Sequence, residues 1–177
     1  ASGLGPASRC AVALALESGG QPESTVLALG GQVPAVMAAF ANGAMAHSLD
    51  YDDQTPWGQH ASSSLIPAVL AVAERRGGVS GKELITAVAV GQDLFNRMRQ
   101  HCDWRKDWFF STIMGVFSAT AAAGRVLGLS PQQIANALGI ASLQSSGTTE
   151  MVNATGSDLR AVYAGFPAKG AVLATLL

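Results

Sequence analysis

Two histidines and three aspartates lie within residues 45–60, MAHSLDYDDQTPWGQH, although only 13% of the chain is charged. Imidazole and carboxylate groups transfer protons near neutral pH, and they also bind divalent metal ions. His47 and Asp50 share one face of the preceding helical pattern, and Asp53 would join them after one more turn. Asp50 or Asp53 could orient or partner His60 if the intervening loop folds back. The stretch therefore predicts an acid/base pair.

Two other interpretations of this stretch stay open. The acidic loop can be solvated, with His47 hydrogen-bonded in the core as a structural residue. A metal site is less favoured, because hard cations prefer more oxygen ligands and transition metals prefer further histidines at fixed spacing. We expect neither a metal ion nor a cofactor.

A second group of polar residues occurs in GSDLRAVYAGFPAKG, residues 156–170. Arg160 and Tyr163 fall on one side of a helical turn, and Lys169 follows a few residues later. A guanidinium pairs bidentately with a carboxylate, and a phenol donates one directed hydrogen bond. These three side chains are candidate anchors for substrate carboxylates, although Arg160 and Lys169 could also be ordinary surface charges.

Helical patterns that could position these residues cover most of the chain. Paired glycines, prolines near first turns and S-x-x-E/Q capping boxes mark where helices start and stop. The expected helices are 8–18, 33–50, 62–76, 80–101, 111–129, 130–144 and 168–177, with one short extended piece at 24–29. The aromatic residues in 103–112 are expected to anchor the following helix or an oligomer interface. The sequence thus predicts an all-α fold.

The composition agrees with tightly packed helices. Alanine and leucine dominate, 20 residues are glycine, and only 6% are aromatic. A net charge of −1 argues against a nucleic-acid partner or an anionic membrane surface. Neither a signal peptide nor a membrane span is evident, and Cys10 and Cys102 lack disulfide or metal-ligand spacing. We expect a soluble, cytoplasmic protein.

Both ends of the sequence look cut. The chain starts in ASGLGPASR without an initiator methionine, and it ends in the apolar helical run AKGAVLATLL without a cap. No composition shift or linker marks an internal boundary. We therefore expect residues 1–177 to form a single helical domain that belongs to a longer protein.

Several segments together resemble the MmgE/PrpD family. The segments are AFANGAMAHSLDYDD (39–53), the following His60, SSSLIPAVLAVAE (62–74), and STIMGVFSATAAAGRVLGLSPQQIANALGIASLQSSG (111–147). The family includes 2-methylcitrate dehydratase, cis-aconitate decarboxylase and iminodisuccinate epimerase. The resemblance implies that this chain is the large all-helical domain of a protein that also has a smaller α+β lid domain and forms homodimers. It also implies an enzyme that acts on small di- or tricarboxylates without a metal, with the active site between the two domains.

The resemblance also implies roles for single residues. Asp50 and His60 occupy the positions of the family's catalytic aspartate and histidine. Arg160 and Tyr163 stand where many members have lysine and histidine, and Gln54 stands where a threonine is common. A histidine common in the family is replaced by Phe110. Arginine does not carry protons as lysine can, so these changes bear on substrate and reaction.

The expected function that follows is a lyase. The first expectation is a dehydratase that acts on a methylcitrate-like hydroxy acid and abstracts a proton next to a carboxylate. Asp50 and His60 would be its catalytic residues. The expected substrate-binding residues are Gln54, Arg160, Tyr163 and Lys169. An epimerase of imino- or amino-dicarboxylates and a decarboxylase of a cis-aconitate-like acid are the enzymatic alternatives. A helical dimerisation module is the non-enzymatic alternative.

Overall fold

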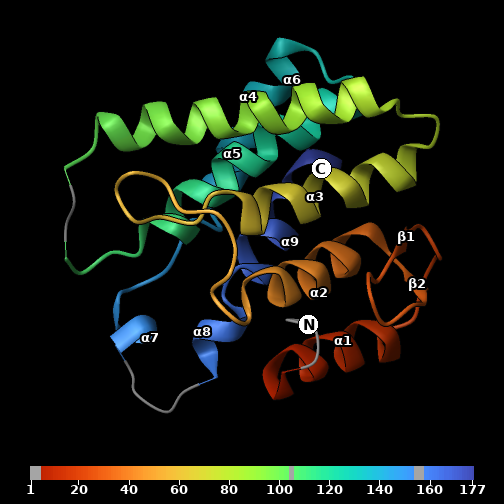
Figure 1. Ribbon diagram of the computed structural model, residues 1–177. Helices are drawn as coiled ribbons and strands as arrows, with labels where there is room; N and C mark the ends of the chain where they lie inside the picture. Colours follow the sequence, from red (N-terminus) through yellow and green to blue (C-terminus); the bar gives the residue numbers. More distant parts are fainter. Residues whose placement is uncertain (1–4, 104–105, 154–157) are drawn as a thin grey trace.

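Helices make up most of the described structure (Figure 1), which is a computed structural model that describes residues 5–103, 106–153 and 158–177. The helices are α1 (Pro6–Glu17), α2 (Ala35–His47), α3 (Ser62–Arg76), α4 (Gly81–Gln100), α5 (Phe110–Leu127), α6 (Pro131–Ser142), α7 (Glu150–Asn153), α8 (Leu159–Val162) and α9 (Gly165–Leu176). Strand β1 (Ser24–Thr25) pairs antiparallel with β2 (Gln32–Val33). The all-α prediction is confirmed. Helices α7 and α8 were not predicted, because four residues are too few to show a helical period.

Helix α5 lies at the centre and packs against α3, α4, α6 and α9 (Figure 1). Its buried positions are mostly alanine, glycine, serine and threonine, which allow close helix packing. Among the described helices, α5 alone is long and apolar enough to cross a membrane by length and composition, but 72% of it is buried within the protein. Such burial is usual for a core helix.

The capping boxes that the sequence predicts are both present. The Ser80 hydroxyl accepts a hydrogen bond from the Glu83 backbone N–H, and the Glu83 carboxylate accepts one from the Ser80 backbone. Ser130 and Gln133 make the same reciprocal pair at the start of α6. These bonds satisfy N–H groups that a helix start otherwise leaves unpaired.

The predicted aromatic anchor before α5 is only partly described, because Trp104 lies outside the described residues. Phe110 is buried with Phe95 and Met114 in a small apolar cluster. Trp108 is half exposed, and its backbone bridges to Thr148. The stretch therefore packs the start of α5 against α4.

Helix α2 ends earlier than its sequence pattern suggests. Its last residue is His47, and the helical extension that would have carried Asp53 onto the same face does not form. Asp50 has a positive φ of 58°, a left-handed conformation that aspartate tolerates better than most residues. The chain therefore turns away from the α2 axis at Asp50.

Two glycines bring α2 and the start of α9 into backbone contact. A Cβ on Gly165 would lie 2.5 Å from the Phe40 carbonyl oxygen, and a Cβ on Gly43 would lie 2.8 Å from the Ala164 carbonyl oxygen. No larger residue fits without moving a backbone. This contact places the α8–α9 turn beside the C-terminal half of α2 (Figure 1).

Substituting these glycines tests the contact. We expect Gly43→Ala and Gly165→Ala each to lower the free energy of unfolding by about 1–3 kcal/mol, because the added methyl group meets backbone atoms. Gly139→Ala is the matched control, since Gly139 is exposed in α6 with no atom near its Cβ position. It should raise stability by up to about 1 kcal/mol. Chemical unfolding measures all three, and equal effects at the three positions would contradict the packing.

Candidate functional site

Two histidines and two aspartates converge where α2 ends and α3 begins. One possible ligand atom from each of His47, Asp50, Asp52 and His60 lies within 4.8 Å of the others. His47 closes α2, His60 precedes α3, and the loop between them carries both aspartates. The loop folds back because Thr55 and Gln59 pair through their backbones, with a Thr55 N–H···O=C Gln59 distance of 2.8 Å. We call these four side chains the His–Asp cluster.

His47 is the buried member of this cluster, with a side chain fully shielded from solvent. Its Nδ1 lies 2.8 and 3.0 Å from the two carboxylate oxygens of Asp52. Its Nε2 lies 3.5 Å from Asp50 Oδ1 and has no hydrogen-bond partner within the described residues. His47 is buried, as the sequence predicts for a structural histidine, but its ring also lies next to the titratable groups of Asp50 and Asp52.

His60 presents its Nε2 to the same oxygen of Asp50, again at 3.5 Å. Its Nδ1 lies 3.0 Å from the Asp53 carbonyl oxygen, which can only accept, so Nδ1 carries the proton in the neutral ring. The backbone N–H of His60 donates to Ser111 Oγ at 3.1 Å. In neutral His60 the unprotonated nitrogen is therefore Nε2, the one near Asp50.

The Asp53 carboxylate has a different role from the one the loop pattern suggested. Its Oδ1 accepts hydrogen bonds from the backbone and hydroxyl of Ser62 at the start of α3, and its Oδ2 accepts one from Gln92 at 3.0 Å. Only the Asp53 backbone carbonyl meets His60. Among the described residues, Asp50 and Asp52 are the aspartates whose carboxylates face the two imidazoles.

The contacts in the cluster shift the pKa values of Asp52 and His60. Burial raises the pKa of Asp52, but hydrogen bonds from His47 and His60 outweigh it and leave the pKa well below the usual range. The hydrogen bond to Asp52 is the main reason that the pKa of His60 is raised, against the opposing effect of burial. Asp52 therefore stays ionised, and His60 holds a proton more readily than a free histidine.

Arg160 and Tyr163 reach this cluster from the α8–α9 turn. Arg160 Nη2 donates to Asp50 Oδ2 at 2.5 Å, with both side chains less than half exposed. The Tyr163 ring lies 4.4 Å from the His47 ring and 4.7 Å from the Phe109 ring, measured between centroids. Burial, followed by the negative charges of Asp52 and Asp50, raises the pKa of Tyr163, so the phenol stays protonated.

The structure thus brings together four of the six predicted site residues, Asp50, His60, Arg160 and Tyr163. Gln54 is exposed in the loop. Lys169 points its Nζ at the rings of Phe40 and Phe166, 5.8 and 5.6 Å from their centroids. Both were predicted to bind substrate, and the structure places neither against the His–Asp cluster.

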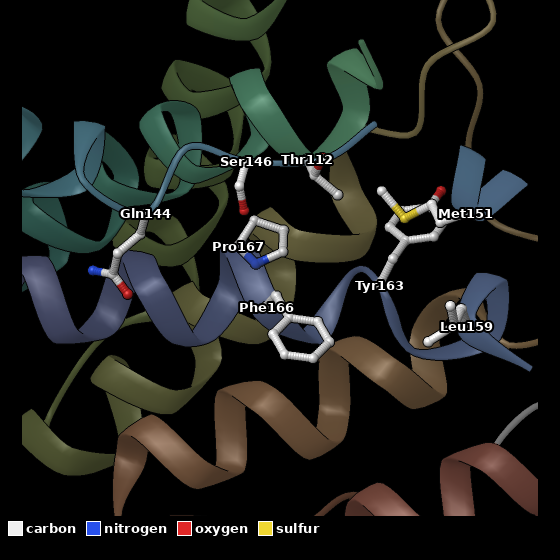
Figure 2. A pocket seen from close by; sticks show the side chains of 9 residues that line it. Thr112, Gln144, Ser146, Met151, Leu159, Tyr163, Phe166 and Pro167 are labelled. Atoms are coloured by element: carbon white, nitrogen blue, oxygen red, sulfur yellow. The ribbon is translucent and has the colours of Figure 1, made fainter. Parts of the chain in front are cut away.

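A pocket of about 230 Å³ is lined in part by Tyr163 (Figure 2), whose ring also packs on His47. In Figure 2 the Pro167 ring lies below Ser146 and the Tyr163 ring lies beside Met151, whereas the Phe166 ring points the other way, toward α2. The full lining is Thr112, Gln144, Ser146, Gly147, Met151, Leu159, Tyr163, Phe166 and Pro167. These described lining residues carry no charge, and the volume is below the roughly 300–1,000 Å³ usual for drug-sized ligands. The pocket suits a small molecule.

Asp52 is the site residue that sequence reasoning left without a role. It lies five residues after His47, a spacing that no single helix face accommodates. The contact forms only because α2 stops at His47 and the chain turns at Asp50. Hydrophobic periodicity holds no signal for such a turn.

Comparisons with known proteins agree with the resemblance in the sequence. The protein-family model for the MmgE/PrpD N-terminal domain matches residues 2–177 of the sequence. Cis-aconitate decarboxylase of Homo sapiens is 31% identical over 153 residues, which cover 82% of this chain and 31% of that protein. The same enzyme of Aspergillus terreus is 30% identical over 163 residues, covering 86% and 32%. The chain thus spans about a third of the length of these curated relatives.

Asp52→Asn tests the buried pairing. We expect it to lower the free energy of unfolding by about 1–3 kcal/mol, because an amide loses the charge-assisted bond and leaves His47 poorly paired. Asp93→Asn is the control, since Asp93 forms an exposed pair with Arg97, and should change stability little. Chemical unfolding near neutral pH measures both. Equal stability of the two variants would show that Asp52 does not hold His47.

Proposed function

The chain belongs to the MmgE/PrpD family, and we propose that it carries the acid/base residues of a lyase that acts on a small di- or tricarboxylic acid. The observation that carries the proposal is the line of contacts from His60 through Asp50 to Arg160, with 3.5 Å from His60 Nε2 to Asp50 Oδ1 and 2.5 Å from Asp50 Oδ2 to Arg160. A proton carrier, a carboxylate and a fixed cation occur within a few ångströms, beside a pocket for a small molecule.

Each group supports one part of such a reaction. The His60 imidazole gives or takes a proton at Nε2, while the bond from Nδ1 to the Asp53 carbonyl holds the ring in position. Arg160 has N–H groups besides the one bound to Asp50, and these can pair with a substrate carboxylate. The Tyr163 phenol can donate a hydrogen bond to negative charge that develops on the substrate.

Decarboxylation of a cis-aconitate-like acid is the first candidate reaction. The curated relatives reported above are cis-aconitate decarboxylases. In this reaction the bond to one carboxylate breaks, carbon dioxide leaves, and the electron pair stays on the substrate carbon skeleton. Protonated His60 would supply the proton that this carbanion-like intermediate needs, and Arg160 would hold a remaining carboxylate.

Dehydration of a methylcitrate-like hydroxy acid is the second candidate. It needs a base for the proton next to a carboxylate and an acid for the departing hydroxide. Asp50 and His60 lie close enough to divide these roles. Arginine at position 160 favours this candidate over reactions that need a lysine to carry a proton, because arginine keeps its own proton. The homodimer and the lid domain that the resemblance implies stay predictions.

The isotopic composition of the product distinguishes the reactions. Incubating the whole protein with cis-aconitate or 2-methylcitrate in deuterated water should give carbon dioxide and a product with one new C–D bond if the enzyme is a decarboxylase. Loss of water with retention of all carbons would identify a dehydratase. Deuterium exchange without loss of either would indicate an epimerase, and no turnover of any acid would contradict the lyase proposal. Mass spectrometry and NMR follow all outcomes.

Replacing His60 tests its assigned role. We expect His60→Gln to lower kcat by about 10²–10⁴-fold, because glutamine cannot transfer a proton, while the amide can keep a hydrogen bond to the Asp53 carbonyl. The melting temperature should change little. His101→Gln is the control, since His101 is exposed at the end of α4, and its activity should equal that of the parent. Parallel loss of fold and activity in His60→Gln would instead assign His60 to the core.

A further inference from the structure

We propose that His47, Asp50 and His60 form a binding site for a divalent transition-metal ion such as Zn²⁺, and that the ion inhibits the reaction when it binds. The sequence disfavours a metal, because a hard cation usually takes more oxygen ligands and a transition metal further histidines at fixed spacing. The fold nevertheless brings the Nε2 atoms of the two histidines to 3.5 Å from one carboxylate oxygen, which supplies three ligands of the kinds that zinc takes.

The distances between the ligand atoms fit a zinc coordination sphere. Asp50 Oδ1 is 3.5 Å from His47 Nε2 and 3.5 Å from His60 Nε2. Ligands at about 2.0–2.1 Å from a tetrahedral zinc ion are separated by about 3.3–3.4 Å. Two edges of the tetrahedron are therefore nearly in place before an ion binds.

Both imidazoles are also oriented as metal ligands are. Ligating histidines usually donate their second ring N–H to a carboxylate or a backbone carbonyl, which leaves the other nitrogen free for the metal. His47 Nδ1 faces the Asp52 carboxylate at 2.8 Å, and His60 Nδ1 faces the Asp53 carbonyl at 3.0 Å. In each neutral ring this arrangement leaves Nε2 as the unprotonated nitrogen, 3.5 Å from Asp50 Oδ1.

The unpaired Nε2 of His47 is an independent indication of a ligand. His47 is 1% exposed, and this atom has no hydrogen-bond partner within the described residues. A buried polar atom without a partner is energetically unfavourable. An ion between His47, His60 and Asp50 would satisfy it. A substrate group that has no hydrogen to donate to Nε2 would leave the atom unpaired.

Charge and access also permit a cation. Asp50, Asp52 and Arg160 together give the site a net charge of −1 when both imidazoles are neutral. A bound divalent ion would therefore change the net charge of the site only to +1. The Asp50 side chain is 41% exposed, which leaves an open side of the site for a water molecule as a fourth ligand. Two imidazoles with one carboxylate favour zinc, cobalt or similar ions over magnesium or calcium.

Binding of the ion and the proposed reaction exclude each other. The ion would take the lone pair of His60 Nε2 and the Asp50 oxygen, which are the atoms that the proposed function uses for proton transfer. Inhibition therefore rests on the proposed function, whereas binding does not. A protein without lyase activity would still bind the ion.

Metal titration of the whole protein tests the site. In slightly alkaline buffer we expect calorimetry to show saturable binding of Zn²⁺ near one equivalent per chain, and Co²⁺ to give the visible absorption of a four- or five-coordinate ion. Mg²⁺ should give neither signal. His60→Gln and Asp50→Asn should each weaken binding by about 100-fold or more, and Asp52→Asn by roughly 10–100-fold, because Asp52 orients His47.

A matched control separates this site from chance binding by other side chains. His101 and Cys102 are adjacent and exposed at the end of α4, so the double variant His101→Gln/Cys102→Ser removes the adventitious alternative and should keep full affinity. Circular dichroism confirms that each variant is folded. The proposal is overturned if Zn²⁺ fails to bind saturably, or if binding survives in His60→Gln and Asp50→Asn. Activity that is restored by a chelator would confirm inhibition.

Discussion

The backbone contact between Gly43 and Gly165 is the constraint on which the site depends. It lets α9 begin directly against α2, and the turn before α9 then carries Tyr163 onto the His47 ring and Arg160 onto Asp50. Residues more than a hundred positions apart in sequence meet because each helix has a glycine where the two backbones touch. The two glycines thus allow the helices to approach closely enough for the residues of the site to meet.

The Asp52 carboxylate also helps to hold the site together, through its contacts with the two imidazoles. It lies mostly shielded between two imidazoles, and the hydrogen bonds from these rings keep it ionised where desolvation alone would favour the neutral acid. A buried anion of this kind is tolerated only with partners that offset its desolvation. His47 is therefore both a packing residue of α2 and a support for the charge that tunes His60.

The sequence allowed the helical fold and the first candidates for the site to be predicted, for identifiable reasons. Capping boxes at Ser80 and Ser130 are local and depend on neighbouring residues alone. Asp50 and His60 could be named from their types and from the family resemblance. Asp52 could not be assigned, because its contact depends on where α2 stops. Lys169 was grouped with Arg160 by proximity in sequence, whereas in the fold it lies on the rings of Phe40 and Phe166.

The left-handed backbone of Asp50 has a consequence for how variation at this position should be interpreted. A φ of 58° is readily accepted by glycine, asparagine and aspartate, and poorly by residues that are β-branched or bulky. Evolution at this position is therefore restricted by backbone geometry as well as by chemistry. An aspartate retained there among homologues would not by itself indicate catalysis, whereas an asparagine or glycine would mark a lineage that kept the turn and lost the carboxylate.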